Sequence, residues 1–275
     1  AGTSGVSPFG INVPLSYTQA YASFGVRCVI GSAIPNNAGS LEPIKVTAPP
    51  GCILNAPRPH AVAVRHVIGQ MLPDVVLGCI DKALPHRAPA EGSSSLWNPM
   101  MTGGPGLLNG QDYGNATSFS VTIFHSGGTG ALPWRDGLSA TAFPSGVRNT
   151  PVEITESIAP VIFHRKELRP GSGGDGRYRG GHGQLIEIVH AQGAPFAIFA
   201  LFDRVDYPAR GRNGGTDGAP GVVRLASGKT LKTKGKQIVP AGERLVMELP
   251  GGGGYGDPAE RERALCERDH NNEID

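Results

Sequence analysis

The chain has 275 residues, of which 39% are hydrophobic and 17% charged, so it is long enough for one large domain or two ordinary ones. Its 25 basic and 23 acidic side chains leave a formal net charge of +2, which excludes a strong electrostatic footprint for nucleic acid or an anionic membrane. No apolar run approaches the ~20 residues of a membrane span. The 41 glycines and 24 prolines follow no triplet repeat and indicate a globular protein rich in turns.

The four cysteines, Cys28, Cys52, Cys79 and Cys266, are scattered and form no C-x-x-C pair. We expect them to be reduced thiols of a cytoplasmic protein, with no zinc site built from them. The sequence starts without an initiator Met and without the basic and apolar regions of a signal peptide. We therefore expect a piece of a longer polypeptide.

The first predicted helix begins behind Ser16, which has a capping-box partner in Gln19. Its expected buried face consists of apolar side chains at three- and four-residue steps, namely Tyr17, Ala20, Tyr21, Phe24 and Cys28. Gly31 is expected to end this helix. The alternation in residues 43–48 then predicts a strand.

A second helix is predicted over residues 61–83, which are mostly apolar around the whole circumference and therefore buried. Pro73 is expected to kink or divide it, because a proline cannot donate the backbone hydrogen bond that a helix interior needs.

From about residue 118 the apolar pattern alternates, and Gly/Pro clusters separate the runs as in a β-sandwich or barrel. The predicted strands are residues 118–124, 152–155, 161–168, 184–189, 196–202 and 244–249. Asp257 and Pro258 predict the start of a short, charged final helix.

The predicted fold class is α+β, with a helical N-terminal portion packed on a larger β-rich module that has Gly/Pro-rich loops. We place the helix-rich portion at residues 1–115, the β-rich portion at 116–258 and a charged C-terminal tail at 259–275.

Two segments match G-x-G-x-x-G, at residues 171–176 and 251–256. A dinucleotide loop must open a helix whose amides hold a pyrophosphate, but the first segment is followed by more glycine and a predicted strand. After the second, only 19 residues remain, too few for another strand and its acidic residue. Neither ends in Gly-Lys-Ser/Thr. We interpret both as tight turns or close backbone contacts at a domain junction, and we expect no nucleotide site in this chain.

The usual catalytic and metal motifs are not found in the sequence. No serine lies in a G-x-S-x-G elbow, and no two histidines have the H-x-x-x-H or H-E-x-x-H spacing. We therefore expect no metal site formed by this chain alone.

The remaining candidate residues interrupt apolar or glycine-rich stretches. Arg65 and His66 lie in the second predicted helix, with Asp74 farther along it. A buried Arg needs a carboxylate or several acceptors, so we favour an internal tie between Arg65 and Asp74, with His66 as a core residue. The alternative is a polar pocket in which His66 moves a proton.

Arg177, Arg179 and His182 lie in the first glycine segment. Together with exposed amides they could clamp an anionic group, although a loop that faces solvent or another subunit is the simpler interpretation. Arg148, just before a predicted strand, has the same two interpretations, and a structural turn is favoured.

A family resemblance is carried by five segments in series, residues 37–44, 65–76, 148–153, 167–183 and 250–258. Each is weak alone, but in this order and spacing they resemble the hydantoinase B/oxoprolinase family up to about residue 260. The resemblance implies that the chain is the C-terminal half of a B subunit, since B subunits are much longer than this chain.

The resemblance also implies a type of chemistry. Members are parts of ATP-dependent enzymes that open lactams and cyclic imides such as 5-oxoproline and N-methylhydantoin, and ketone carboxylases are relatives. The hydantoinase A-type partner, an actin-like ATPase, would hold ATP and Mg and phosphorylate the substrate carbonyl oxygen. A divalent metal, if one is used, would lie on the N-terminal part of the B subunit, so no cofactor or metal ligand is expected here.

The resemblance singles out the catalytic candidates Arg65, His66 and Asp74 and the substrate- or phosphate-binding candidates Arg148, Arg177, Arg179 and His182. The leading hypothesis is a B-type portion of a cytoplasmic cyclic amide hydrolase that works only with an A-type partner. The alternatives are a subunit of an acetone- or acetophenone-type ketone carboxylase and a non-catalytic assembly module. No nucleic-acid or membrane partner is expected.

Overall fold

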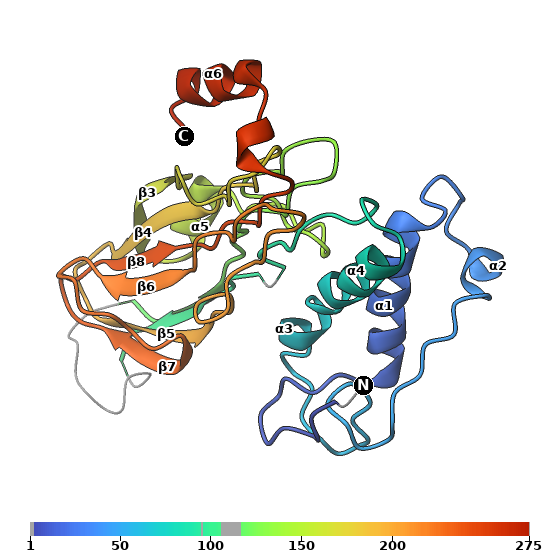
Figure 1. Ribbon diagram of the computed structural model, residues 1–275. Helices are drawn as coiled ribbons and strands as arrows, with labels where there is room; N and C mark the ends of the chain where they lie inside the picture. Colours follow the sequence, from blue (N-terminus) through green and yellow to red (C-terminus); the bar gives the residue numbers. More distant parts are fainter. Residues whose placement is uncertain (1–2, 95, 106–116, 275) are drawn as a thin grey trace. The chain divides into compact units, whose positions relative to one another are not determined.

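The computed structural model describes residues 3–94, 96–105 and 117–274 (Figure 1). Its helices and two antiparallel sheets confirm the α+β class. The chain divides into two compact units, Ala1–Pro89 and Ala90–Asp275. The boundary lies earlier than the residue 115 expected from sequence. Among the described residues, no helix is both long and apolar enough to cross a membrane.

Unit 1 contains the helices α1 (Leu15–Val29), α2 (Ala38–Leu41), α3 (His66–Gly69) and α4 (Leu72–Ala83). The buried residues of α1 are Thr18, Ala22 and Gly25, and this face packs on α4. A Cβ on Gly25 would lie 3.1 Å from the Cα of Pro73, so small side chains set how closely the two helices approach.

The expected buried face of α1 was therefore wrong. Phe24 and Cys28 are exposed, since they lie on the side of the helix that does not pack on α4. The capping box at Ser16 was also wrong, because Pro14 is the N-cap and makes no side-chain cap. Residues 43–48, expected to be a strand, form no regular element. They are held instead by the Gln19 amide, which donates to the Val46 carbonyl at 3.2 Å.

The second predicted helix is divided, but at residues 70–71 between α3 and α4. Pro73 lies in the first turn of α4, where a missing N–H costs nothing because no intrahelical acceptor is available for it.

Unit 2 contains two four-stranded antiparallel sheets, ordered β2-β1-β5-β7 and β3-β4-β8-β6. The strands are β1 (Met100–Gly103), β2 (Phe119–Thr122), β3 (Val161–Leu168), β4 (Gln184–His190), β5 (Phe196–Leu201), β6 (Val222–Leu225), β7 (Lys234–Val239) and β8 (Leu245–Glu248). One hydrophobic core contains inward side chains of both sheets, such as Ile198 of β5 and Ile186 of β4. The sheets thus form the sandwich that the alternation predicted.

One predicted strand of unit 2 was wrong. Residues 152–155 lie in helix α5 (Val152–Ile158), although Val, Ile and Thr favour strands. Pro151 supplies the N-cap, Glu153 lies in the first turn, and the Glu156 carboxylate accepts the amide of Phe163 at 2.7 Å. Strands β1, β6 and β7 were not predicted from the sequence.

A layer of extended, glycine-rich segments continues the sandwich, and we call it the glycine layer: residues 127–131, 172–182, 211–218 and 251–255. Gly252 donates to the Gly181 carbonyl at 2.9 Å, and Gly174 donates to the Gly252 carbonyl at 2.8 Å. A Cβ on Gly252 would lie 1.9 Å from the carbonyl oxygen of Thr129. The segments can therefore lie this close only because glycine has no Cβ. This confirms the interpretation of the glycine motifs as close backbone contacts.

The C-terminal segment begins as predicted, with the Asp257 side chain accepting the amide of Ala259 at 2.9 Å. It forms the 3₁₀ turn η1 (Pro258–Glu260) and helix α6 (Arg263–Asn271).

Candidate functional site

The seven predicted site residues are divided between the two units. Arg65, His66 and Asp74 belong to unit 1, and Arg148, Arg177, Arg179 and His182 belong to unit 2.

In unit 1, Arg65 is exposed, which corrects its expected burial. Its guanidinium lies 5.5 Å from the centre of the Tyr17 ring and donates to the Val62 carbonyl at 3.3 Å. Arg65 is the N-cap of α3 and not an internal helix residue, because the helix begins at His66 and not at residue 61 as expected. Asp74 is buried in the first turn of α4.

A groove of about 1050 Å³ also lies in unit 1, beside α1. Its apolar lining consists of Ala20, Phe24, Ile34, Leu41, Ile44 and Val46. Arg65, His66 and Asp74 are not among its lining residues, so the polar pocket expected around His66 is not this groove.

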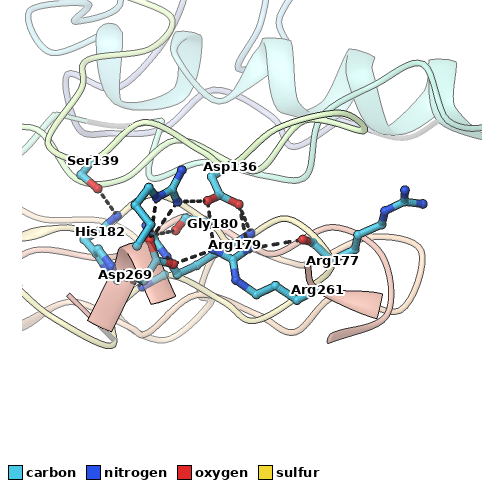
Figure 2. A network of polar contacts seen from close by, with 10 residues as sticks. Asp136, Ser139, Arg177, Arg179, Gly180, His182, Arg261 and Asp269 are labelled. Atoms are coloured by element: carbon cyan, nitrogen blue, oxygen red, sulfur yellow. Dashed lines mark hydrogen bonds and ion pairs between the residues drawn. The ribbon is translucent and has the colours of Figure 1, made fainter. Parts of the chain in front are cut away.

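In unit 2 the structure brings Arg179 and His182 together with charged residues that sequence reasoning missed (Figure 2). We call the charged residues the clasp: Asp136, Arg179, Arg261, Arg268 and Asp269. The first two come from the body of unit 2 and the last three from the C-terminal segment.

Asp269 is the centre of the clasp. Its Oδ2 accepts from Arg179 Nε at 3.1 Å and from Arg261 at 2.5 Å, and its Oδ1 accepts from Arg268 at 2.8 Å. Burial alone would raise the pKa of Asp269, but the guanidinium hydrogen bonds outweigh burial and lower it to about 2.

Asp136 ties the C-terminal segment to the loop that precedes Gly137. Its two oxygens accept from Arg261 at 2.9 and 3.0 Å, a bidentate geometry, and Oδ1 also accepts the backbone amide of Arg179 at 2.7 Å. The pKa of Asp136 is lowered, because hydrogen bonds from Arg261 and Arg268 outweigh the effect of burial.

His182 lies fully buried beside the clasp. Its Nδ1 accepts the amide of Gly173 at 3.1 Å, and its own amide donates to Ser139 Oγ at 3.0 Å. Burial and then the charge of Arg179 lower the pKa of His182 to about 4, against weaker opposite effects of Asp269, the Ile274 backbone and Asp136. The imidazole is therefore neutral at pH 7 and carries its proton on Nε2, which makes no hydrogen bond of normal geometry within the described residues.

The other two basic candidates lie outside the clasp. Arg177 is half exposed, with its guanidinium 5.6 Å from the centre of the Tyr178 ring and 3.8 Å from a Glu260 oxygen. Arg148 is exposed, and its neighbour Asn149 is anchored instead, since its amide donates to the Ala140 carbonyl at 3.1 Å. The anion clamp, which was the less favoured interpretation of Arg177, Arg179 and His182, is not assembled in this structure, because Asp269 and the Gly180 carbonyl accept from the Arg179 guanidinium.

A second charge cluster was also missed, in which Glu91 and Arg204 are nearly buried and Arg210 is exposed. Glu91 accepts from Arg204 at 2.9 Å and from Arg210 at 2.9 and 2.5 Å. The backbone of Glu91 is built into the glycine layer, because its carbonyl accepts the amide of Gly253 at 2.8 Å. A lone acid between small residues gives no sequence signal of partners more than 100 positions away.

The glycine motifs do not fit a phosphate cradle. The amides of Gly251, Gly252, Gly253 and Gly254 donate to backbone carbonyls within unit 2, and that of Gly173 donates to His182. An anion-binding loop needs such amides to point at the ligand. In the described part of the chain, no group of three or more His, Cys, Asp or Glu side chains is placed to hold a metal ion.

An antiparallel sandwich extended by a glycine layer and preceded by a helical unit defines the class of protein, an α+β scaffold whose glycine segments act in backbone packing. Residues 1–258 match the model of the hydantoinase B/oxoprolinase family, and the chain belongs to that family.

Three similar proteins illustrate the relationship. A 5-oxoprolinase of Dictyostelium discoideum is 33% identical over 261 residues, covering 92% of this chain and 19% of the relative. The crystal structure of an ATP-dependent caprolactamase from Pseudomonas jessenii has a TM-score of 0.83 at 25% identity and covers 98% of this chain and 48% of that one. A nucleotide-free acetone carboxylase has a TM-score of 0.69 at 18% identity, covering 96% of this chain and 40% of that one, which shows a shared fold.

The chain therefore spans about a fifth of the length of the 5-oxoprolinase and about half of the caprolactamase chain.

Proposed function

We propose that the chain is a B-type portion of an ATP-dependent cyclic amide hydrolase of the hydantoinase/5-oxoprolinase type. The observation that carries this proposal is the family match over residues 1–258. The relative in Dictyostelium discoideum is a 5-oxoprolinase, and the similar crystal structure is a caprolactamase. Both names denote opening of a cyclic amide, so this substrate class is favoured over a ketone.

An A-type partner is proposed to bind ATP and Mg and to activate the substrate. An amide is a poor electrophile, and transfer of a phosphoryl group to its carbonyl oxygen gives water a better target and provides a leaving group. The engaged amides of residues 251–254 support a nucleotide site outside the glycine motifs of this chain.

The roles of individual residues are part of the proposal. His66 and Asp74 would move protons in the complete enzyme, and Arg65, exposed at the N-terminus of α3, is the third catalytic candidate. Arg148 and Arg177 are the basic candidates with exposed side chains, and they would contact the phosphorylated substrate. Arg179 and His182 would act in the architecture of the C-terminal region. We propose a cytoplasmic location for the complex.

The proposal is tested with the complete complex, including the A-type partner. ATP and either 5-oxoproline or caprolactam should yield phosphate and the ring-opened acid in equal amounts. His66→Ala should lower kcat by about 100-fold or more, as for loss of a general acid–base group. Lys229→Gln, at the exposed tip between β6 and β7, is the matched control and should leave kcat unchanged.

Two results would contradict this proposal. Bicarbonate-dependent consumption of a ketone, without lactam opening, would instead identify a carboxylase subunit. Unchanged lactam turnover in both His66→Ala and Arg177→Ala would make the chain an assembly module.

A further inference from the structure

The C-terminal segment, residues 259–274, lies beyond the family match and is held in an unusual way. Within α6 the one buried residue is Asp269, and Leu265 is only half-buried. A nine-residue helix is not stable alone in water, so docking to the body of unit 2 must hold it. The segment is therefore fixed mainly by charge and not by an apolar face.

The ion pairs that hold it differ in exposure. The carboxylates of Asp136 and Asp269 are nearly buried, at 10% and 4% exposed, whereas the Arg268 side chain that bridges them is 46% exposed. Water and salt ions reach such a bridge, so its attraction is screened as ionic strength rises. Loss of the bridge leaves two carboxylates of like charge with Arg179 and Arg261 as their remaining cations.

His182 lies under this segment. The charged groups that face its imidazole are Arg179, Asp136 and Asp269, and the backbone of Ile274 lies close to it. Gly173 and Ser139 hold the other side of the residue. Departure of the segment removes Asp269 and the Ile274 backbone together, and water then reaches Nε2.

We propose that the C-terminal segment is an electrostatically held strap that opens and closes over His182, so that ionic strength and pH decide whether this imidazole is buried. The strap is closed in the structure described here. It opens by release of Asp269 and Arg268 from the body of unit 2, without unfolding of the sandwich.

The pH dependence has a defined sign. In the closed state burial keeps the pKa of His182 at about 4, and in the open state it returns toward 6.5. The open state therefore binds a proton more readily, and acid favours opening, by about 20-fold between neutral pH and pH 5. Protonation of Asp269 also favours opening, but only at a pH below the ordinary pKa of an aspartate, because the carboxylate keeps its charge above that pH.

The test compares Asp269→Asn with Glu267→Gln in the full chain. Both variants remove one negative charge from α6, but Glu267 is exposed and pairs with Arg263, which lies four residues earlier on the same helix. Hydrogen exchange of the amides of residues 261–274 reports strap opening, and NMR titration of His182 reports its burial. Asp269→Asn should speed exchange at least tenfold and raise the His182 pKa, and Glu267→Gln should change neither by more than about twofold.

Wild-type protein gives a second test that needs no variant. The protection factors of residues 261–274, which are the intrinsic exchange rates at each pH divided by the observed rates, should fall with added NaCl and with a fall from neutral pH to pH 5, while those of β4 and β8 stay high. Equal effects of the two variants would overturn the proposal. So would protection factors of the strap that are insensitive to salt and pH, or protection factors that fall equally in the strap and in β4.

Discussion

The glycine layer and the clasp lie side by side in unit 2 but are stabilised by different forces. In the layer, backbone amides and carbonyls pair, as between Gly252 and Gly181, and the segments lie so close that a Cβ on Gly128 would meet the Gly181 carbonyl oxygen. In the clasp, long side chains bring charges together from positions 136 to 269. The backbone pairs between the layer's glycines therefore carry no charge on which salt or acid could act, but they leave no room for a side chain, whereas the ion pairs of the clasp respond to both salt and acid.

The largest effect is expected for Gly128→Ala. The added Cβ would lie 1.7 Å from the carbonyl oxygen of Gly181. This oxygen belongs to the backbone, so it cannot move aside as the end of a flexible side chain could. We expect a loss of about 4 kcal/mol or more in the free energy of unfolding, measured by denaturant titration.

Gly228→Ala is the matched control for this variant. It meets no atom within 4 Å but has a φ of +94°, so only backbone strain of about 1–2 kcal/mol is expected. If Gly128→Ala and Gly228→Ala lowered the free energy of unfolding equally, steric crowding would not be the reason that the layer needs glycine.

A smaller effect is expected for Glu91→Gln, where the nearly buried pair of Glu91 and Arg204 meets the layer. Burial alone would raise the pKa of Glu91, but the Arg210 hydrogen bonds and the Arg204 charge lower it. Removal of the charge leaves Arg204 nearly buried without its carboxylate, so we expect a loss of about 3 kcal/mol in thermal unfolding. Glu167→Gln, whose side chain is half exposed, should have almost no effect.

The next effect is acid sensitivity of unit 2. Burial lowers the pKa of His125 to about 3 and that of His182 to about 4, below the ordinary value of 6.5. The unfolded chain thus binds protons that the folded chain refuses, and stability falls as pH drops from 6.5 toward these values. The slope approaches about 1.4 kcal/mol per pH unit for each histidine. His125→Phe should make the decline of the melting temperature between pH 7 and pH 5 shallower, and an unchanged decline would contradict the prediction.

The smallest effect is expected for Arg263→Gln on the exposed face of α6. The pair between Arg263 and Glu267 is a helix i,i+4 pair with both side chains largely exposed, so it contributes about 0.3–0.5 kcal/mol. Urea titration should show a change of this size at most. A larger loss would mean that the outer face of α6 also helps to hold the segment.

Several elements could be predicted because their signals are local. Strand β3 has the predicted bounds, and β4 shows the predicted alternation, with every second side chain buried. Asp257 caps η1 as predicted, because a cap needs only the next two residues. By contrast, Val152–Ile158 forms a helix because Pro151 and Glu153 outweigh the strand preference of its β-branched residues.

The candidate site was predicted only in part. Arg179 and His182 could be selected from the sequence because they are polar residues in a glycine-rich segment, and the structure places them together. Asp136 and Asp269 carried no such signal, since 43 and 90 positions separate them from Arg179. The charged composition of residues 259–274 is equally typical of a tail in solvent and of a segment that docks through ion pairs, so the sequence did not distinguish the two.

The sequence by itself determined the α+β class, most strand positions and membership of a series of family motifs, because these depend on periodicity and on order along the chain. Only the tertiary structure decided which face of α1 is buried, which backbone each glycine segment touches and which carboxylate neutralises Arg179. The physical reason is that these contacts join residues far apart in sequence. Their partners are chosen by packing and charge balance in the folded chain.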